Sequence, residues 1–151
     1  MTAADVELAV VNYYNPRTNI IVPNVSWGLL GHEADLLVYT PRDRVHEVEI
    51  KVSVADTKAD LKKQGHHMSF YIDKLWFAMP FSLGARAMPF IPDHAGVLLV
   101  RDEEKTVIRH REAKQNPVVR RYVGFKTDLL RLGNLRVWPL KKQILELTRH
   151  G

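Results

Sequence analysis

Two strand-like segments joined by a short polar turn constrain this chain more than any other feature. The first, residues 35–39, begins with an acid, Asp35, and continues with apolar side chains. The second, residues 47–52, alternates charged and apolar side chains, and its charged members are Glu47, Glu49 and Lys51. Alternate side chains of a strand point to opposite faces, so these three share one face. The turn at residues 40–44 predicts that the two strands pair as an antiparallel hairpin.

This hairpin would bring Asp35 beside Glu49 and Lys51. Adjacent carboxylates with one nearby amine make a site for a hard divalent cation that acts on a phosphodiester. The alternative is a surface ion pair across the two strands, which would contribute at most about 1 kcal/mol to stability.

The composition predicts one domain. At 151 residues the chain is long enough for a single hydrophobic core and too short to expect two. It contains no cysteine, which excludes disulfides and thiolate metal sites. Its apolar runs are far shorter than a membrane span, and its first residues lack the pattern of a secretion signal. We therefore expect a cytoplasmic protein with no membrane segment.

The charge of the chain is unevenly distributed. Residues 1–75 contain eight Lys and Arg against ten Asp and Glu, whereas residues 76–151 contain fourteen against seven. Acids thus gather around the predicted site, and bases fill the half that follows. This asymmetry favours a protein that binds a polyanion, although a solvated basic surface would have the same composition.

The hydrophobic pattern predicts an α/β fold. Helices are expected over residues 2–14, 54–69, 117–132 and 140–148. Strands, besides the two in the hairpin, are expected over residues 20–27, 75–79, 96–101 and 107–111. The order helix–strand–strand–strand–helix–strand predicts one domain over residues 1–151, with a core at about 1–112 and a basic helical tail at about 116–151.

The acid at the start of one strand and the Glu-x-Lys in the next, Asp35 and then Glu49-Ile50-Lys51, resemble the PD-(D/E)XK nuclease superfamily. The neighbouring sequence is similar to its MmcB-like DNA-repair branch over about residues 30–112. The segments that carry this similarity are VEIKVS (48–53), the Ala55-Asp56 pair with Asp60 and Lys62, YIDKLWFAMP (71–80) and GVLLV (96–100). The resemblance implies a restriction-endonuclease-like domain. Its central mixed sheet, flanked by helices, would have an αβββαβ core with an extra β-hairpin and C-terminal helices.

The resemblance also implies a phosphodiesterase that depends on Mg²⁺ or Mn²⁺. Asp35 and Glu49 would be metal ligands, together with the backbone carbonyl of Ile50. Lys51 would orient the attacking water or stabilise charge on the phosphate. Glu7, on the first helix, matches the position of an additional acid in many members, although an acid on an exposed helix side explains it equally well.

Several other residues are candidates for supporting roles. Glu47 would be a second acid behind Glu49 or an ordinary exposed residue. His32 is best described as a turn histidine, and the adjacent His66 and His67 cannot both face one metal. The candidate phosphate contacts, for each of which a solvated surface is the alternative, are Lys58, Lys62, Arg120 and Arg121.

These observations predict a metal-dependent nuclease that acts on DNA in repair, recombination or phage-related processing. The sequence contains no pattern typical of direct contacts to base edges. We therefore expect the protein to recognise double-stranded or branched DNA rather than a fixed base sequence. A homodimer would suit the cutting of both strands. The alternatives are a non-catalytic nucleic-acid-binding module and a partner-recruiting domain with the same fold.

Overall fold

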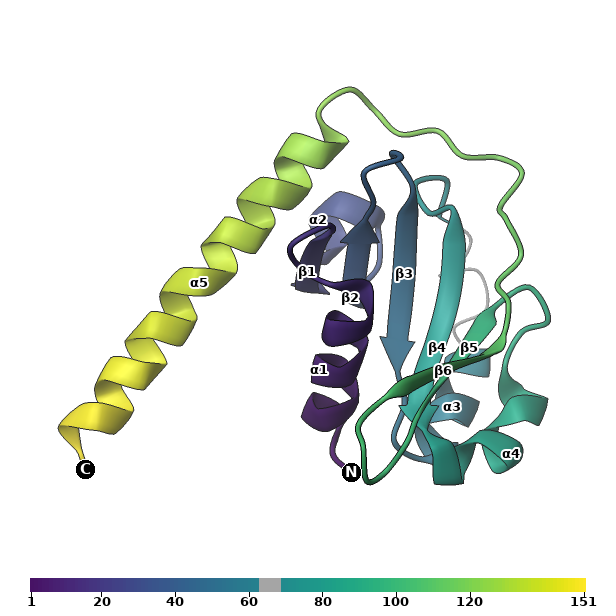
Figure 1. Ribbon diagram of the computed structural model, residues 1–151. Coiled ribbons are helices and arrows are strands. Elements are labelled where there is room, and N and C mark those ends of the chain that lie inside the picture. The colour runs from purple at the N-terminus through teal and green to yellow at the C-terminus, as the bar shows by residue number, and fades with distance from the viewer. Residues whose placement is uncertain (63–68) are drawn as a thin grey trace.

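A six-stranded sheet forms the centre of the computed structural model, which describes residues 1–62 and 69–151, apart from the Trp27 side chain (Figure 1). Its strands follow one another in sequence order: β1 (Ile20–Val25), β2 (Ala34–Tyr39), β3 (Val45–Ile50), β4 (Lys74–Pro80), β5 (Gly96–Val100) and β6 (Val107–Arg111). The β3–β4 and β4–β5 pairs are parallel, and the other neighbours are antiparallel. The predicted mixed sheet and the β5–β6 hairpin are therefore confirmed.

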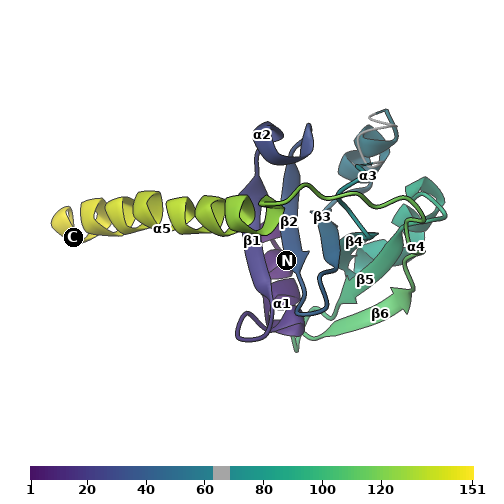
Figure 2. The same cartoon turned by 90° about the horizontal axis from the view of Figure 1, so that it is seen from above.

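Helices cover both faces of the sheet (Figure 2). Their bounds are α1 (Ala3–Tyr14), α2 (Trp27–Leu30), α3 (Val54–Leu61), α4 (Gly84–Ala87) and α5 (Phe125–Arg149), with short 3₁₀ turns on either side of α4. On one face α1 buries Val6 and Val10 in a cluster with Leu36, Val48 and Trp76. The opposite face packs against α2, α4 and the first turns of α5. The predicted single α/β domain with an αβββαβ core is confirmed. No helix in the described part of the chain has the length and apolar character to cross a membrane.

The two predicted helices of the core begin where their capping residues place them. Thr2 accepts a hydrogen bond from the backbone N–H of Asp5, and the Asp5 carboxylate accepts one from Thr2 in return. Ser53 caps α3 in the same way. The predicted helix over residues 54–69 is shorter in the structure, since α3 ends at Leu61 and residue 69 is not helical.

The C-terminal region differs from the prediction. Residues 112–124 contain no helix, and α5 then runs as one helix through Pro139. The predicted helix start at 117 was wrong because backbone hydrogen bonds hold this segment against the loop before β4. The N–H of Asn116 donates to the Asp73 carbonyl at 2.8 Å, and the N–H of Arg120 donates to the Phe70 carbonyl at 2.7 Å.

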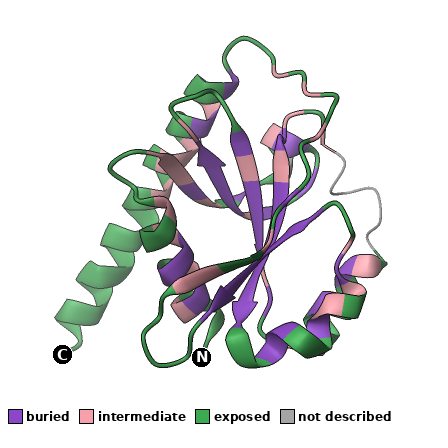
Figure 3. Cartoon of the chain, turned by 45° about the vertical axis from the view of Figure 1, so that its right-hand side comes forward, coloured by how far each residue is buried: buried purple, intermediate pink, exposed green. Residues whose placement is uncertain are grey.

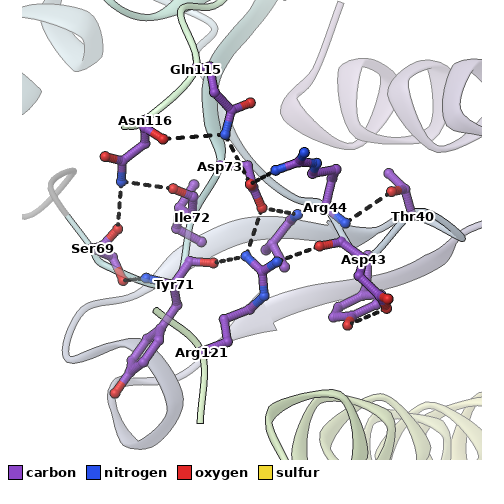
Figure 4. A network of polar contacts seen from close by, with 12 residues as sticks. Thr40, Asp43, Arg44, Ser69, Tyr71, Ile72, Asp73, Gln115, Asn116 and Arg121 are labelled. Carbon is purple, nitrogen blue, oxygen red and sulfur yellow. Dashed lines mark hydrogen bonds and ion pairs between the residues drawn. The ribbon is translucent and has the colours of Figure 1, made fainter. Parts of the chain in front are cut away.

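A buried carboxylate, Asp73, joins this segment to the sheet (Figure 4). Its Oδ2 accepts hydrogen bonds from the backbone N–H of Val45 at 2.8 Å and from Arg121 Nη1 at 2.7 Å. Its Oδ1 accepts from Gln115 Nε2 at 3.0 Å and from Arg44 Nη1 at 3.1 Å. Burial alone would raise the pKa of Asp73, but these hydrogen bonds outweigh it and hold the pKa below its usual value.

Arg121 has its guanidinium engaged inside the protein. Besides Asp73, it donates to the carbonyls of Tyr71 and Asp43. The neighbouring Arg120 is exposed and takes part in this contact only through its backbone. The two adjacent arginines therefore have different structural roles.

Arg121→Ala should lower the free energy of unfolding by about 3 kcal/mol, because it removes one cation from a buried ion pair. Arg120→Ala is the matched control and should change it by less than about 0.5 kcal/mol. Urea unfolding followed by circular dichroism measures both. Equal effects of the two substitutions would contradict the assignment of Arg121 as an internal anchor.

Candidate active site

The predicted acidic cluster lies where β2 begins and β3 ends. The two strands pair with Leu36 opposite Val48, so the next position along places Asp35 across from Glu49. Oδ2 of Asp35 accepts a 2.7 Å hydrogen bond from the backbone N–H of Ile50. The hairpin thus brings Asp35 to the Glu-x-Lys segment.

Glu49 and Lys51 are both buried, with exposed fractions of 6% and 8%. Lys51 Nζ lies 3.4 Å from Glu49 Oε2 and 2.9 Å from Oδ2 of Asp60, which α3 supplies. Burial alone would lower the pKa of Lys51, but the charge of Glu49 and the contact with Asp60 outweigh it and raise the pKa. The ammonium therefore stays charged at neutral pH, and the group is not a surface ion pair.

Glu49 has the most perturbed environment of the cluster. Burial, followed by the negative charges of Asp35 and Glu47, raises its pKa to about 9, and Lys51 opposes this only in part. Its buried Oε1 accepts no hydrogen bond from the described residues. Carboxylates that repel one another in this way favour either a bound proton or a bound cation.

Glu47 and His32 form a buried pair next to Glu49. His32 Nε2 lies 2.8 Å from Glu47 Oε1, and both side chains are almost completely enclosed. The negative charge of Glu47 is in turn one of the causes of the raised pKa of Glu49. Of the two roles considered for Glu47, the geometry fits an acid behind Glu49, and the description of His32 as a turn histidine missed this pairing.

Glu7 approaches the same strand end from α1. It is half-buried, and burial together with the charge of Asp35 raises its pKa. Because the charge of Asp35 contributes to this shift, Glu7 lies near the cluster. This is the position expected for the additional acid.

The donor set suits a hard cation, which prefers carboxylate and carbonyl oxygens. Asp35, Glu49 and the Ile50 carbonyl make up the predicted ligands, and a cation would relieve the repulsion at Glu49. Within residues 1–62 and 69–151, no three His, Asp or Glu side chains are grouped to hold a metal ion by themselves. The predicted set contains two side chains and one backbone oxygen, so the remaining ligands would be water.

A pocket of about 340 Å³ opens beside this cluster. Its polar lining consists of Asn24, Ser26, Glu33, Asp35 and Arg136. Of the predicted catalytic residues, Asp35 lines this pocket, and Glu49 and Lys51 do not. Arg136 reaches it from α5, a hundred residues away in the sequence.

The four candidate phosphate contacts lie in different settings. Lys58 and Lys62 are exposed residues of α3 and its C-terminal cap, and Lys58 Nζ lies 4.7 Å from the centre of the Phe90 ring. Arg120 is exposed, and Arg121 is committed to Asp73. A DNA contact by Arg121 therefore has no support in its geometry. His66 and His67 lie outside the described residues.

Sequence reasoning missed the pairing of His32 with Glu47 and gave Asp60 no role beyond the family resemblance. It indicated Arg136 only as one of many basic residues of the tail that could contact a nucleic-acid backbone. The sequence spacing could have indicated Asp60. It follows Thr57 by three residues, so both side chains lie on the same side of α3, and both are buried. No local signal marks Arg136, because only the packing of α5 against β1 brings it to the pocket.

Comparisons with known proteins agree with this architecture. A family model described as "DNA repair protein MmcB-like" matches residues 2–136. The solved structure of SPO1766, a protein of unknown function from Silicibacter pomeroyi, superimposes with a TM-score of 0.70. The two sequences are 17% identical, and the match covers 100% of this chain and 96% of that one, so it shows a shared fold. No curated protein matches. Since the family model covers most of the chain, the protein belongs to the MmcB-like family of DNA repair proteins.

Proposed function

We propose that this protein is a deoxyribonuclease of the PD-(D/E)XK type that depends on Mg²⁺ or Mn²⁺ and acts in DNA repair. The observation that carries the proposal is the cluster of the half-buried Asp35 with the buried Glu49 and Lys51 at one end of the sheet. Burial and then the neighbouring negative charges raise the pKa of Glu49 to about 9. Strongly shifted pKa values are concentrated at functional sites.

Each residue has a role in this proposal. Asp35, Glu49 and the Ile50 carbonyl would hold the cation, with Glu7 as a further acid nearby. When bound, the cation supplies Lewis-acid chemistry and makes a bound water acidic. Lys51 keeps its proton and places a positive charge where negative charge builds on the phosphate during attack.

Phosphodiester hydrolysis can be tested with two substitutions that address different roles. Asp35→Asn keeps an oxygen that can accept the hydrogen bond from Ile50 but removes the charge that would hold the cation. Lys51→Ala removes the ammonium. Each should reduce cleavage of plasmid, single-stranded or branched DNA by about 100-fold or more. Glu103→Gln, which alters an exposed acid in the β5–β6 turn, is the control and should cleave like the parent.

One observation favours a second function, a nucleic-acid-binding module without turnover. Asp35 is hydrogen bonded to Ile50, and Lys51 is paired with Asp60, so both can be satisfied by the protein itself. A parent protein that binds DNA but does not cleave it with Mg²⁺ or Mn²⁺ would establish this function and contradict the nuclease. Negligible binding of DNA at low salt would instead favour a partner-recruiting domain.

We also infer that two copies associate through the second half of α5, which extends beyond the sheet (Figures 1 and 3). Three apolar residues continue the inward side of the helix into solvent, with exposed fractions of 56%, 61% and 75%: Leu140, Ile144 and Leu147. A groove of about 610 Å³ lies between α5 and α1, and its apolar lining includes Leu8, Val11 and Ile21. α1 contains two acids and no base, whereas residues 137–151 contain three Lys and Arg and one Glu. Leu140 already lines the groove of its own chain. The charges are complementary, so Ile144 and Leu147 of one copy would enter the groove of the other.

Sedimentation equilibrium tests this association. We expect a dimer for the parent, a monomer for Ile144→Asp, and a dimer for Leu145→Asp, whose side chain points to the opposite side of α5. A monomeric parent at concentrations of about 100 µM, where weak dimers form, would contradict the inference.

A further inference from the structure

We propose that the pocket beside Asp35 is a phosphate subsite, in which Arg136 binds a phosphate of the DNA strand next to the one that is cleaved. This inference rests on the nuclease function proposed above. It assigns a role in substrate binding to α5, which lies outside the αβββαβ core.

Arg136 is positioned for this role by the packing of α5 on the sheet. One nitrogen of its guanidinium, Nη2, donates to the backbone carbonyl of Asn24 at the end of β1. A second, Nε, is buried and has no hydrogen-bond partner among the described residues. Within the same residues, no carboxylate forms an ion pair with Arg136. Buried N–H groups are nearly always satisfied, and Nε in this structure has almost no exposed surface, so an acceptor in the pocket would reach it once the guanidinium turns toward the pocket.

The lining of the pocket favours a phosphate as that acceptor. A guanidinium has five donors in a planar fork that matches the oxygens of a phosphate group. Ser26 and Asn24 add neutral polar groups to the same pocket. Glu33 and Asp35 line it as well, and both carboxylates would repel a small free anion. We therefore expect DNA to bind here much more tightly than inorganic phosphate.

The position of Asp35 in the same pocket defines what the subsite would do. A phosphate held by Arg136 would lie next to the phosphodiester that is cleaved at the cation held by Asp35. Arg136 is therefore a positioning residue, which fixes the strand while the cluster at Glu49 acts on the adjacent bond. The alternative is that Arg136 serves only to fasten α5 to β1 through the Asn24 carbonyl.

The substitution Arg136→Gln removes the charge and the fork, and its shorter amide also gives up the contact with the Asn24 carbonyl. Arg136→Lys separates the two roles, because its longer side chain can still donate to that carbonyl but has no planar fork. The matched control is Arg131→Gln on the same helix, which removes the same charge from an exposed residue that pairs with Asp128. Thermal unfolding should confirm that both variants fold like the parent. Arg136→Lys keeps the charge without the fork and should lie between the parent and Arg136→Gln.

Fluorescence anisotropy with labelled duplex DNA in EDTA measures binding without cleavage. Arg136→Gln should weaken binding by about 10-fold or more. It should also make the slope of log K against log salt concentration shallower by about one, since one fewer phosphate is neutralised. Arg131→Gln should change binding by less than about 2-fold. Equal losses in both variants would show a general effect of charge and would overturn the proposal.

The same assay distinguishes two sources of the phosphate. If the bound group is a strand end, Arg136→Gln should lose affinity only for 5′-phosphorylated DNA and not for its 5′-hydroxyl form. If it is an internal phosphodiester, both forms should lose affinity equally. Either pattern supports the subsite.

A second measurement separates this proposal from the nuclease itself. In NMR spectra of the parent, the Nε–H signal of Arg136 should shift when a short DNA duplex is added in EDTA. A shift without any cleavage activity would retain the subsite and reject the nuclease. An unmoved signal, together with unchanged DNA binding by Arg136→Gln, would overturn the subsite even if Asp35→Asn abolishes cleavage.

Discussion

The burial of several carboxylates at one end of β3 is the constraint on which the site depends. β3 lies inside the sheet between β2 and β4, and four of its six residues are buried, Glu47 and Glu49 among them. Placing Glu47 and Glu49 on the same face of such a strand is unfavourable unless positive partners accompany them. His32 pairs with Glu47, and Lys51 is shared between Glu49 and Asp60. The repulsion that remains is concentrated on Glu49, and a divalent cation would remove it.

The site is assembled from elements far apart in the sequence, and each is held by a separate part of the fold. The parallel pairing of β3 and β4 places α3, and with it Asp60, beside Lys51. The contact of α1 with the sheet brings Glu7 within electrostatic reach of Asp35. The Asp73 network fastens the segment before α5, and α5 then crosses β1 and delivers Arg136 to the pocket.

The sequence predicted the parts of this arrangement that depend on local pattern. The hairpin followed from alternation and turn residues, α1 followed from its apolar side, and the start of α3 followed from Ser53 as a capping residue. The C-terminal region was predicted less well, because its extended path depends on hydrogen bonds to Asp73 and Phe70 that no local pattern encodes. Arg120 and Arg121 look equivalent in sequence, yet only Arg121 is held inside the protein. Pairings such as His32 with Glu47 depend on packing between elements and were missed for the same reason.

A crystal structure grown with Mn²⁺ tests the cation site most directly, because anomalous scattering locates the ion independently of activity. We expect a peak about 2 Å from carboxylate oxygens of both Asp35 and Glu49, and no such peak in Glu49→Gln. Crystals that contain Mn²⁺ but show no density between these two acids would contradict the cation site.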